Sequence, residues 1–224
     1  MIRTANSSLP TTALIPLRGE GKSRLADALG PARRGGLVAA MLDDVLMALS
    51  GCGVSDVVIL AGDGPAEDLA SAHGLRVLRD PIAPTGAAPD EDGRLRAAVD
   101  AGLAVLPADA VRLVVAADLP RLSAAEIATV VADPADVVVV PTVGGGTAVL
   151  RLGPGVMIPV QYGRGSAGAH LRVADARDLT TSVLDLPGAR HDVDAAADLM
   201  ALIGPLDGTM PGPATAAFLD VPAG

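Results

Sequence analysis

A buried strand and the loop after it are encoded by one stretch of the chain, Val111-Arg112-Leu113-Val114-Val115-Ala116-Ala117-Asp118-Leu119-Pro120. The strand part is apolar apart from one arginine, and Val137–Val140 is an unbroken run of valine. Near-continuous apolar runs of this length are typical of strands that helices cover on both faces. The stretch therefore predicts a mainly parallel sheet between two layers of helices.

Alanine-rich helical segments alternate with short apolar strands along most of the chain. The predicted strands are Thr12–Leu17, Asp56–Ala61, Arg76–Leu78, Arg112–Ala116, Asp136–Pro141, Thr147–Leu152 and Ser182–Leu186. The predicted helices are Pro31–Leu49, Pro65–His73, Asp92–Leu106, Ser123–Val131, Ser166–Ala176 and Ala195–Ile203. This alternation predicts a three-layer α/β/α fold. The glycine-containing segment Val143–Leu152 breaks the alternation and predicts a β-hairpin excursion.

The length of 224 residues fits one domain, whose core we expect at about 12–204. Residues 1–10 and 205–224 show no packing pattern, and we expect them to form tails. A net charge of −9 and an aromatic content of 1% argue against a nucleic-acid partner. One cysteine, Cys52, excludes an internal disulfide framework and fits a cytoplasmic protein. Apolar runs stay well short of the ~20 residues that span a bilayer, so no membrane association is expected.

The single lysine of the chain, Lys22, lies in a glycine-containing loop directly after the first predicted strand. Glycine lets backbone N–H groups approach phosphates, and Lys22 and Arg24 would neutralise their charge. The loop holds no complete Walker or dinucleotide fingerprint. On this loop alone, a triphosphate site and a chance surface lysine are equally good interpretations.

Three aspartates predict a metal site. Asp118 directly follows a buried strand, and ligands bind at the carboxyl ends of strands in open α/β sheets. A capping role for Asp118 is disfavoured, because Ser123 already caps the next helix. Asp192 and Asp194 lie on the same side of an extended segment, where a cation would relieve their repulsion. Hard oxygen ligands favour Mg²⁺. The alternative for Asp194 is capping of the helix that follows it.

A second anion site is predicted where glycines precede a helix that begins with serine. Its residues are Gly146, Thr147, Gly163, Arg164 and Ser166. Arg164 and His170 would add positive charge. The alternatives are an ordinary capped helix and, for the lone histidine, a structural role. Asp63 and the pair Asp43-Asp44 are interpreted as turn and solvated-surface residues.

These segments together resemble the CofC/FbiD family, the phosphoenolpyruvate or 2-phospho-L-lactate guanylyltransferases of coenzyme F420 biosynthesis. The resemblance covers about residues 12–204. Its motifs are Gly21-Lys22-Ser23-Arg24-Leu25, Met41-Leu42-Asp43-Asp44-Val45-Leu46, Ala117-Asp118-Leu119-Pro120, Gly145-Gly146-Thr147, Tyr162-Gly163-Arg164-Gly165-Ser166 with His170, and Asp192-Val193-Asp194 before Asp198-Leu199.

The resemblance implies a nucleotidyltransferase fold and transfer of GMP from GTP to the phosphate of a three-carbon acid, with release of pyrophosphate. It implies Mg²⁺ on Asp118, Asp192 and Asp194, and nucleotide phosphates at the Lys22 loop. The acceptor acid would bind near Thr147, Gly163 and Ser166. A second copy of the chain and a downstream transferase of the coenzyme pathway are left open as partners.

The chain departs from the family pattern at several positions. Arg96 replaces an asparagine that helps to hold the nucleoside. Ala117 replaces a glycine, Arg164 a proline, Ala167 an aromatic residue and Ala195 a threonine. Arg96 leaves open another nucleotide, and the last replacements leave open another small phosphorylated or phosphonate acceptor. A non-catalytic nucleotide-binding relative is a separate alternative, against which Lys22, Asp118 and Asp194 argue.

Overall fold

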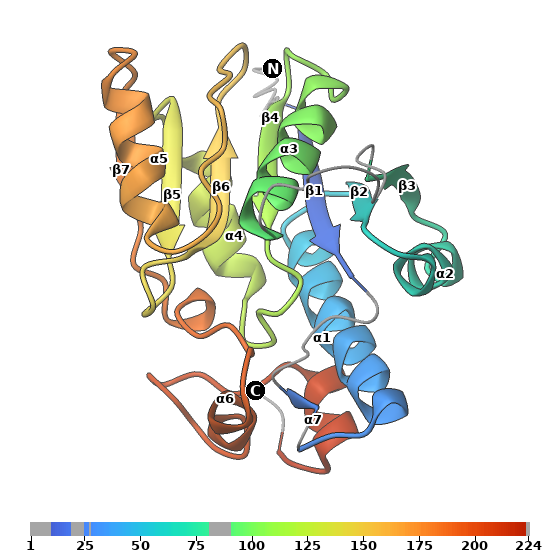
Figure 1. Ribbon diagram of the computed structural model, residues 1–224. Coiled ribbons are helices and arrows are strands. Elements are labelled where there is room, and N and C mark those ends of the chain that lie inside the picture. Colours follow the sequence, from blue (N-terminus) through green and yellow to red (C-terminus); the bar gives the residue numbers. More distant parts are fainter. Residues whose placement is uncertain (1–9, 19–24, 27, 81–90, 223–224) are drawn as a thin grey trace, which may run out of the picture.

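The computed structural model describes residues 10–18, 25–26, 28–80 and 91–222 (Figure 1). Its strands are β1 (Thr11–Leu17), β2 (Asp56–Ala61), β3 (Arg76–Arg79), β4 (Val111–Val115), β5 (Val137–Pro141), β6 (Thr147–Leu152) and β7 (Thr181–Val183). Its helices are α1 (Pro31–Gly51), α2 (Gly64–Ala72), α3 (Glu91–Ala104), α4 (Ala124–Ala132), α5 (Ser166–Asp175), α6 (Ala196–Ala201) and α7 (Pro213–Leu219), with a short 3₁₀ helix at Pro187–Ala189.

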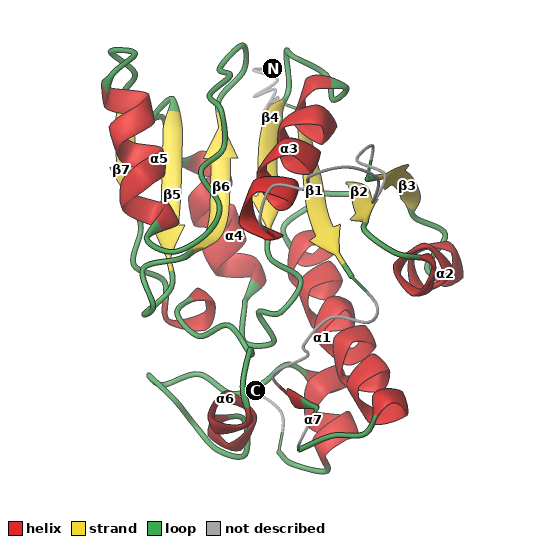
Figure 2. Ribbon diagram, viewed as in Figure 1, coloured by secondary structure: helices red, strands yellow, loops and turns green. Residues whose placement is uncertain are grey.

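The strands form one mixed sheet in the order β3-β2-β1-β4-β6-β5-β7. Its strands run parallel except β6, which is antiparallel to both β4 and β5. The prediction of a mainly parallel sheet with a hairpin excursion is therefore confirmed. The β5–β6 hairpin is the excursion, and it inserts one reversed strand into an otherwise parallel sheet (Figure 2).

Helices cover both faces of this sheet, as the apolar strand runs predict. Side chains from α1, α2 and α4 pack with one face in a continuous core cluster. The opposite face packs against α3 and α5. Every residue of β4 is buried, including Arg112, whose guanidinium donates to the carbonyl of Val156 and contacts the Met157 sulfur. A polar residue thus sits inside the apolar run with its two terminal nitrogens in contact with Val156 and Met157, while its buried Nε has no hydrogen-bond partner among the described residues.

Local signals set several element ends. Ser123 caps α4, accepting a hydrogen bond from the Glu126 backbone N–H, while the Glu126 carboxylate accepts from the Ser123 N–H at 2.9 Å. This reciprocal capping box confirms the cap predicted for Ser123. Asp63 caps α2 by accepting from the Ala66 N–H at 2.8 Å, so it is a helix cap in addition to a turn residue. No helix in the described ranges is both long and apolar enough to cross a bilayer.

The expectation of an unpacked tail at 205–224 is wrong for residues 205–222. Helix α7 lies against α1 (Figure 1), and Phe218 packs over Gly36, where a Cβ atom would meet its ring at 2.8 Å. Phe218 and Leu219 join an apolar cluster with Leu37 and Met41 of α1.

Asp44 explains why α7 docks there. Its side chain is buried and accepts hydrogen bonds of 2.9 Å from the backbone N–H groups of Ala214 and Thr215. The interpretation of Asp44 as a solvated-surface residue is therefore wrong: the carboxylate satisfies the first N–H groups of a helix distant in sequence. Its neighbour Asp43 is half exposed and pairs with His73 at 3.1 Å.

Candidate functional site

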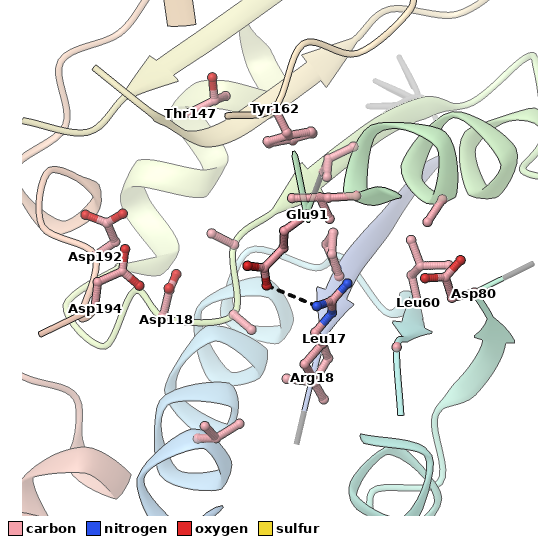
Figure 3. Close-up of a pocket in the computed structure, with 18 of the residues that line it drawn as sticks. Leu17, Arg18, Leu60, Asp80, Glu91, Asp118, Thr147, Tyr162, Asp192 and Asp194 are labelled. Carbon is pink, nitrogen blue, oxygen red and sulfur yellow. Dashed lines mark hydrogen bonds and ion pairs between the residues drawn. The ribbon is translucent and has the colours of Figure 1, made fainter. Parts of the chain in front are cut away.

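A cavity of about 340 Å³ opens at the carboxyl ends of β1, β2, β3 and β4 (Figure 3). This is where an open α/β sheet places its ligands. The floor is apolar, and the polar side chains around it come from seven separate segments. They are Arg18, Asp80, Glu91, Asp118, Thr147, Tyr162, Asp192 and Asp194.

The three aspartates predicted as metal ligands line one end of this cavity, as Figure 3 shows. Asp118 lies in the loop after β4, and its carbonyl accepts a hydrogen bond of 3.3 Å from the Val193 N–H. Val193 is buried in the apolar cluster beneath the site. Because neighbouring side chains of an extended segment point to opposite sides, burying Val193 turns Asp192 and Asp194 toward the cavity. The structure therefore brings the two acidic segments together.

Capping does not account for Asp194. Helix α6 has Ala195 at its N-cap position, and the Asp198 carboxylate accepts from the N–H groups of both Asp194 and Ala195, at 3.0 and 2.7 Å. Asp198 therefore satisfies the N–H groups at the start of α6, which is the capping role that Asp194 was the candidate for. The Asp194 side chain lines the cavity instead.

The carboxylates do not by themselves form a complete metal cage. Among the described residues, no group of three or more His, Cys, Asp or Glu side chains converges on one point in the way that would hold an ion. Mg²⁺ is usually bound through one or two carboxylates together with water and substrate phosphates. The oxygen donors present at this end of the cavity therefore fit a cation that is bound jointly with a phosphorylated ligand.

The reversed direction of β6 brings Thr147 to the site. Thr147 is the first residue of β6, so it lies at the same sheet edge as the last residues of β4. The glycine turn before it is tight: the Gly146 N–H donates to Thr142 Oγ1 at 3.1 Å, and a Cβ on Gly146 would approach that oxygen to 2.8 Å. The Gly145 carbonyl accepts from the Ala167 N–H at 3.2 Å, which ties the turn to the start of α5.

Behind Thr147 lies a buried hydrogen-bonded group. Thr147 Oγ1 is 2.9 Å from Ser166 Oγ and 3.1 Å from His170 Nδ1. Thr147 itself lines the cavity, whereas Gly146, Gly163, Arg164 and Ser166 do not. Burial lowers the pKa of His170 to about 4. The positive charge expected from His170 is therefore wrong, because a buried imidazole is neutral at physiological pH.

The sequence gives no site role to several cavity residues. Arg18 and Glu91 stand in no quoted motif, and Tyr162 begins a family motif in which it has no assigned role. Arg18 directly follows β1 and pairs with Glu91 at 3.1 Å (Figure 3). Gly62 provides room for Arg18, since a Cβ there would lie 2.9 Å from its side chain. Tyr162 packs edge-on against His170, with ring centroids 5.2 Å apart. Burial raises the pKa of Tyr162, so its hydroxyl stays protonated.

The predicted phosphate ligands Lys22 and Arg24 lie outside the described residues. Arg18, on the described side of the same loop, lines the cavity. The loop therefore leaves β1 at the edge of this cavity.

Comparison with known proteins places the chain among nucleotidyltransferases. A family model described as "Guanylyl transferase CofC like" matches residues 11–210. Phosphoenolpyruvate guanylyltransferase of Roseiflexus sp. is 31% identical, covering 85% of this chain and 83% of its own. The 2-phospho-L-lactate guanylyltransferase of Methanothermobacter thermautotrophicus is 33% identical, with coverage of 90% and 87%. The 3-phospho-D-glycerate guanylyltransferase of Phenylobacterium zucineum is 34% identical, with coverage of 83% and 86%.

Solved structures agree on the fold. A nucleotidyl transferase from Methanothermobacter superposes with a TM-score of 0.58 at 16% identity, covering 85% of this chain and 94% of its own. A Mycobacterium tuberculosis H37Rv protein solved in complex with manganese gives a TM-score of 0.51 at 17% identity, covering 86% and 97%. At these identities the likeness concerns the fold alone, and it confirms the predicted nucleotidyltransferase-like architecture.

Proposed function

The chain belongs to the CofC-like guanylyltransferases, and we propose that it transfers GMP from GTP to the phosphate of phosphoenolpyruvate or 2-phospho-L-lactate, releasing pyrophosphate, in coenzyme F420 biosynthesis. One observation carries the proposal. A single cavity joins Asp118, Asp192 and Asp194 at one end to Thr147 at another. A site of this kind suits two anionic reactants that need both charge neutralisation and hydrogen-bond donors.

In the proposed reaction an oxygen of the acceptor phosphate attacks the α-phosphorus of GTP in line. The new O–P bond forms as the bond from the α-phosphorus to the bridging oxygen breaks, and pyrophosphate leaves with the electron pair. The acceptor phosphate is already ionised, so no enzyme nucleophile is required. The protein must hold the reacting atoms within about 3–3.5 Å and stabilise the charge on the phosphoryl oxygens.

Each polar part of the site has a role in this scheme. Asp118, Asp192 and Asp194 would hold Mg²⁺, which when bound would neutralise charge on the phosphates. Lys22 and Arg24 would bind the leaving pyrophosphate. Thr147 would donate a hydrogen bond to the acceptor acid, and the N-terminal end of α5, with Gly163, Arg164 and Ser166, would favour its negative charge.

The remaining end of the cavity suits the nucleobase. Leu60 gives an apolar surface there, and Asp80 lies at that end, away from the three aspartates (Figure 3). The Asp80 backbone N–H donates to the Ala61 carbonyl at 2.9 Å, which fixes the residue after β3. A carboxylate can accept from both N1–H and the 2-amino group of guanine, whereas adenine offers no donor at either position. Asp80 would thus select guanine in a chain where Arg96 replaces the family asparagine.

The proposal is tested by measuring pyrophosphate release from four NTPs with phosphoenolpyruvate, 2-phospho-L-lactate and 3-phospho-D-glycerate, with Mg²⁺ or with EDTA. We expect turnover with GTP and one of the first two acids, lost on chelation and restored by Mg²⁺. Turnover with CTP or ATP in preference to GTP would contradict the nucleotide assignment. GTP binding without turnover on any acid would support a non-catalytic relative instead.

A second candidate acceptor is 3-phospho-D-glycerate. One relative at 34% identity carries this acceptor in its name, and Arg164 and Ala167 depart from the family pattern beside the expected acceptor site. The same screen separates the candidates by their kcat/KM values.

Two partner proposals accompany the reaction: a second copy of the chain, and a downstream transferase that takes up the product. Light scattering tests the first. For the second, we expect a smaller fraction of the product to be lost to hydrolysis when the downstream enzyme is present than when it is absent.

A further inference from the structure

The two ring nitrogens of His170 have different hydrogen-bond partners, and this fixes where the proton sits. Nε2 lies 2.8 Å from the backbone nitrogen of Gln161, a group that only donates. Nε2 must therefore accept, so the neutral ring carries its proton on Nδ1. That proton faces Thr147 Oγ1, which lies 3.1 Å from Nδ1.

The tautomer decides what Thr147 can offer to the cavity. With Nδ1 protonated, Thr147 Oγ1 can only accept from His170, so its own proton remains for Ser166 Oγ at 2.9 Å or for a ligand. If Nε2 carried the proton instead, Thr147 would donate to Nδ1 and turn its lone pairs toward the cavity. Those lone pairs would repel an anionic acid. The Nδ1-protonated ring instead leaves the Thr147 hydroxyl proton available to bind the acid.

We propose that His170 is a positioning residue that holds the Thr147 hydroxyl as a hydrogen-bond donor to the anionic acceptor acid. The side chain of His170 is 0% exposed and does not line the cavity, so it acts through Thr147. The chain of contacts is continuous: the Gln161 N–H sets the ring tautomer, the ring orients Thr147, and Thr147 lines the cavity. The proposal rests on the proposed function for the identity of the acceptor.

A purely structural histidine is the competing explanation, because His170 also packs against Tyr162. Two near-isosteric variants separate the explanations. His170→Asn places an amide nitrogen close to the Nδ1 position and keeps the donor to Thr147. His170→Gln places a carboxamide oxygen close to the Nε2 position and keeps the acceptor for Gln161, but loses the donor.

The kinetic test measures KM for the acceptor acid and for GTP in both variants. Each variant is assayed at a temperature equally far below its own melting temperature. A lost hydrogen bond of this kind corresponds to about a tenfold effect. We expect the acceptor KM to rise about tenfold in His170→Gln and to stay within about threefold of wild type in His170→Asn. The KM for GTP should stay unchanged in both. Equal effects of the two variants, no effect of either, or a matching rise in the KM for GTP would overturn the proposal.

A second readout needs no turnover. ¹⁵N NMR of the imidazole rings distinguishes protonated from bare nitrogens, and the three histidines of the chain can be assigned with the His170 variants. We expect His170 to show a protonated Nδ1 and a bare Nε2, unchanged between pH 8 and about pH 5.5. A protonated Nε2 would overturn the tautomer argument. If the tautomer is as expected but no acid is guanylylated, the proposed function fails while this hydrogen-bond arrangement stands.

Discussion

The Val193 backbone N–H donates to the Asp118 carbonyl at 3.3 Å, and this bond joins the two acidic segments of the site without using either segment's carboxylates. The side chain of Asp118 can therefore be changed while the backbone arrangement is kept. The chemical and structural contributions of this residue are separable for that reason.

Asp118→Asn should lower kcat by at least about 100-fold, comparable to losing one preorganised electrostatic group. The melting temperature should change little, since the backbone bond to Val193 is retained. Pyrophosphate release under saturating GTP, with a thermal unfolding curve as control, checks both parts. Activity within a few-fold of wild type would remove Asp118 from the reaction.

Lys22→Ala should weaken binding of the triphosphate, because a cation facing phosphates would be lost. We expect the KM for GTP to rise at least about tenfold, with a smaller change in the acceptor KM. Arg34→Ala is the matched control, since it removes a partly exposed cation near the start of α1 that does not line the cavity. Equal KM values for GTP in the two variants would contradict the role of Lys22.

Asp80→Asn tests the nucleobase end. The change turns one hydrogen-bond acceptor into a donor, which opposes the 2-amino group of guanine and matches the 2-carbonyl of xanthine. We expect kcat/KM for GTP to fall about tenfold or more and activity with XTP to appear. If the GTP and XTP activities change in parallel, Asp80 does not read the base.

Asp44→Ala should destabilise the protein by about 3 kcal/mol, because two backbone N–H groups at the start of α7 lose a charged acceptor. Urea unfolding measures this free energy. Asp43→Ala is the matched control: its carboxylate is half exposed and pairs with His73, so the expected cost is within about 1 kcal/mol. Similar losses in both variants would argue against the role of Asp44.

Acidification should reduce stability partly through His170. Burial lowers its pKa in the folded chain to about 4 from an ordinary value of 6.5. Between these pH values the unfolded chain binds the extra proton, so the free energy of unfolding falls as the pH decreases from about 6.5 to about 4. The difference in pKa corresponds to a loss of about 3 kcal/mol.

The carboxylates of the chain also titrate in this range, so the measurement is the difference between wild type and His170→Asn. The variant should show a shallower decrease of unfolding free energy across this range. Parallel pH profiles would contradict a neutral, buried His170.

The central sheet could be predicted because its strands are nearly continuous apolar runs. The predicted ranges Asp56–Ala61 and Thr147–Leu152 match β2 and β6, while the predicted Ser182–Leu186 overruns the short edge strand β7. Strands buried on both faces have a nearly continuous apolar sequence, which is a strong local signal. The edge strand β7 is partly exposed, as at Val183, so its apolar pattern is weak.

Helix α7 could not be predicted because its partners are distant in sequence. Its alanine- and proline-rich segment has little helical pattern of its own, and the Asp44 carboxylate and the Gly36 surface that receive it lie in α1. Asp44 was misinterpreted for the same reason, since nothing near it in the sequence indicates a buried partner.

In the candidate site, the sequence predicts residues that stand in motifs, such as Asp118 and the Asp192–Asp194 segment. It assigned no role to Arg18, Glu91 or Tyr162, which also line the cavity. Two of them had a usable signal: Tyr162 begins one of the family motifs, and Arg18 is the first cation after the first strand.

The reversed strand β6 also has a consequence for how the acceptor specificity of such enzymes can change. Strand β6 begins at the sheet edge where β4 ends. The turn before β6, β6 itself and α5 form one continuous segment of the chain, which follows the strands that would hold the nucleotide. Under the proposed function, mutations inside this segment can change which acid is accepted while the inherited nucleotide chemistry is left intact. A hybrid enzyme that exchanges only residues 142–176 between relatives should therefore take on the donor relative's acceptor preference.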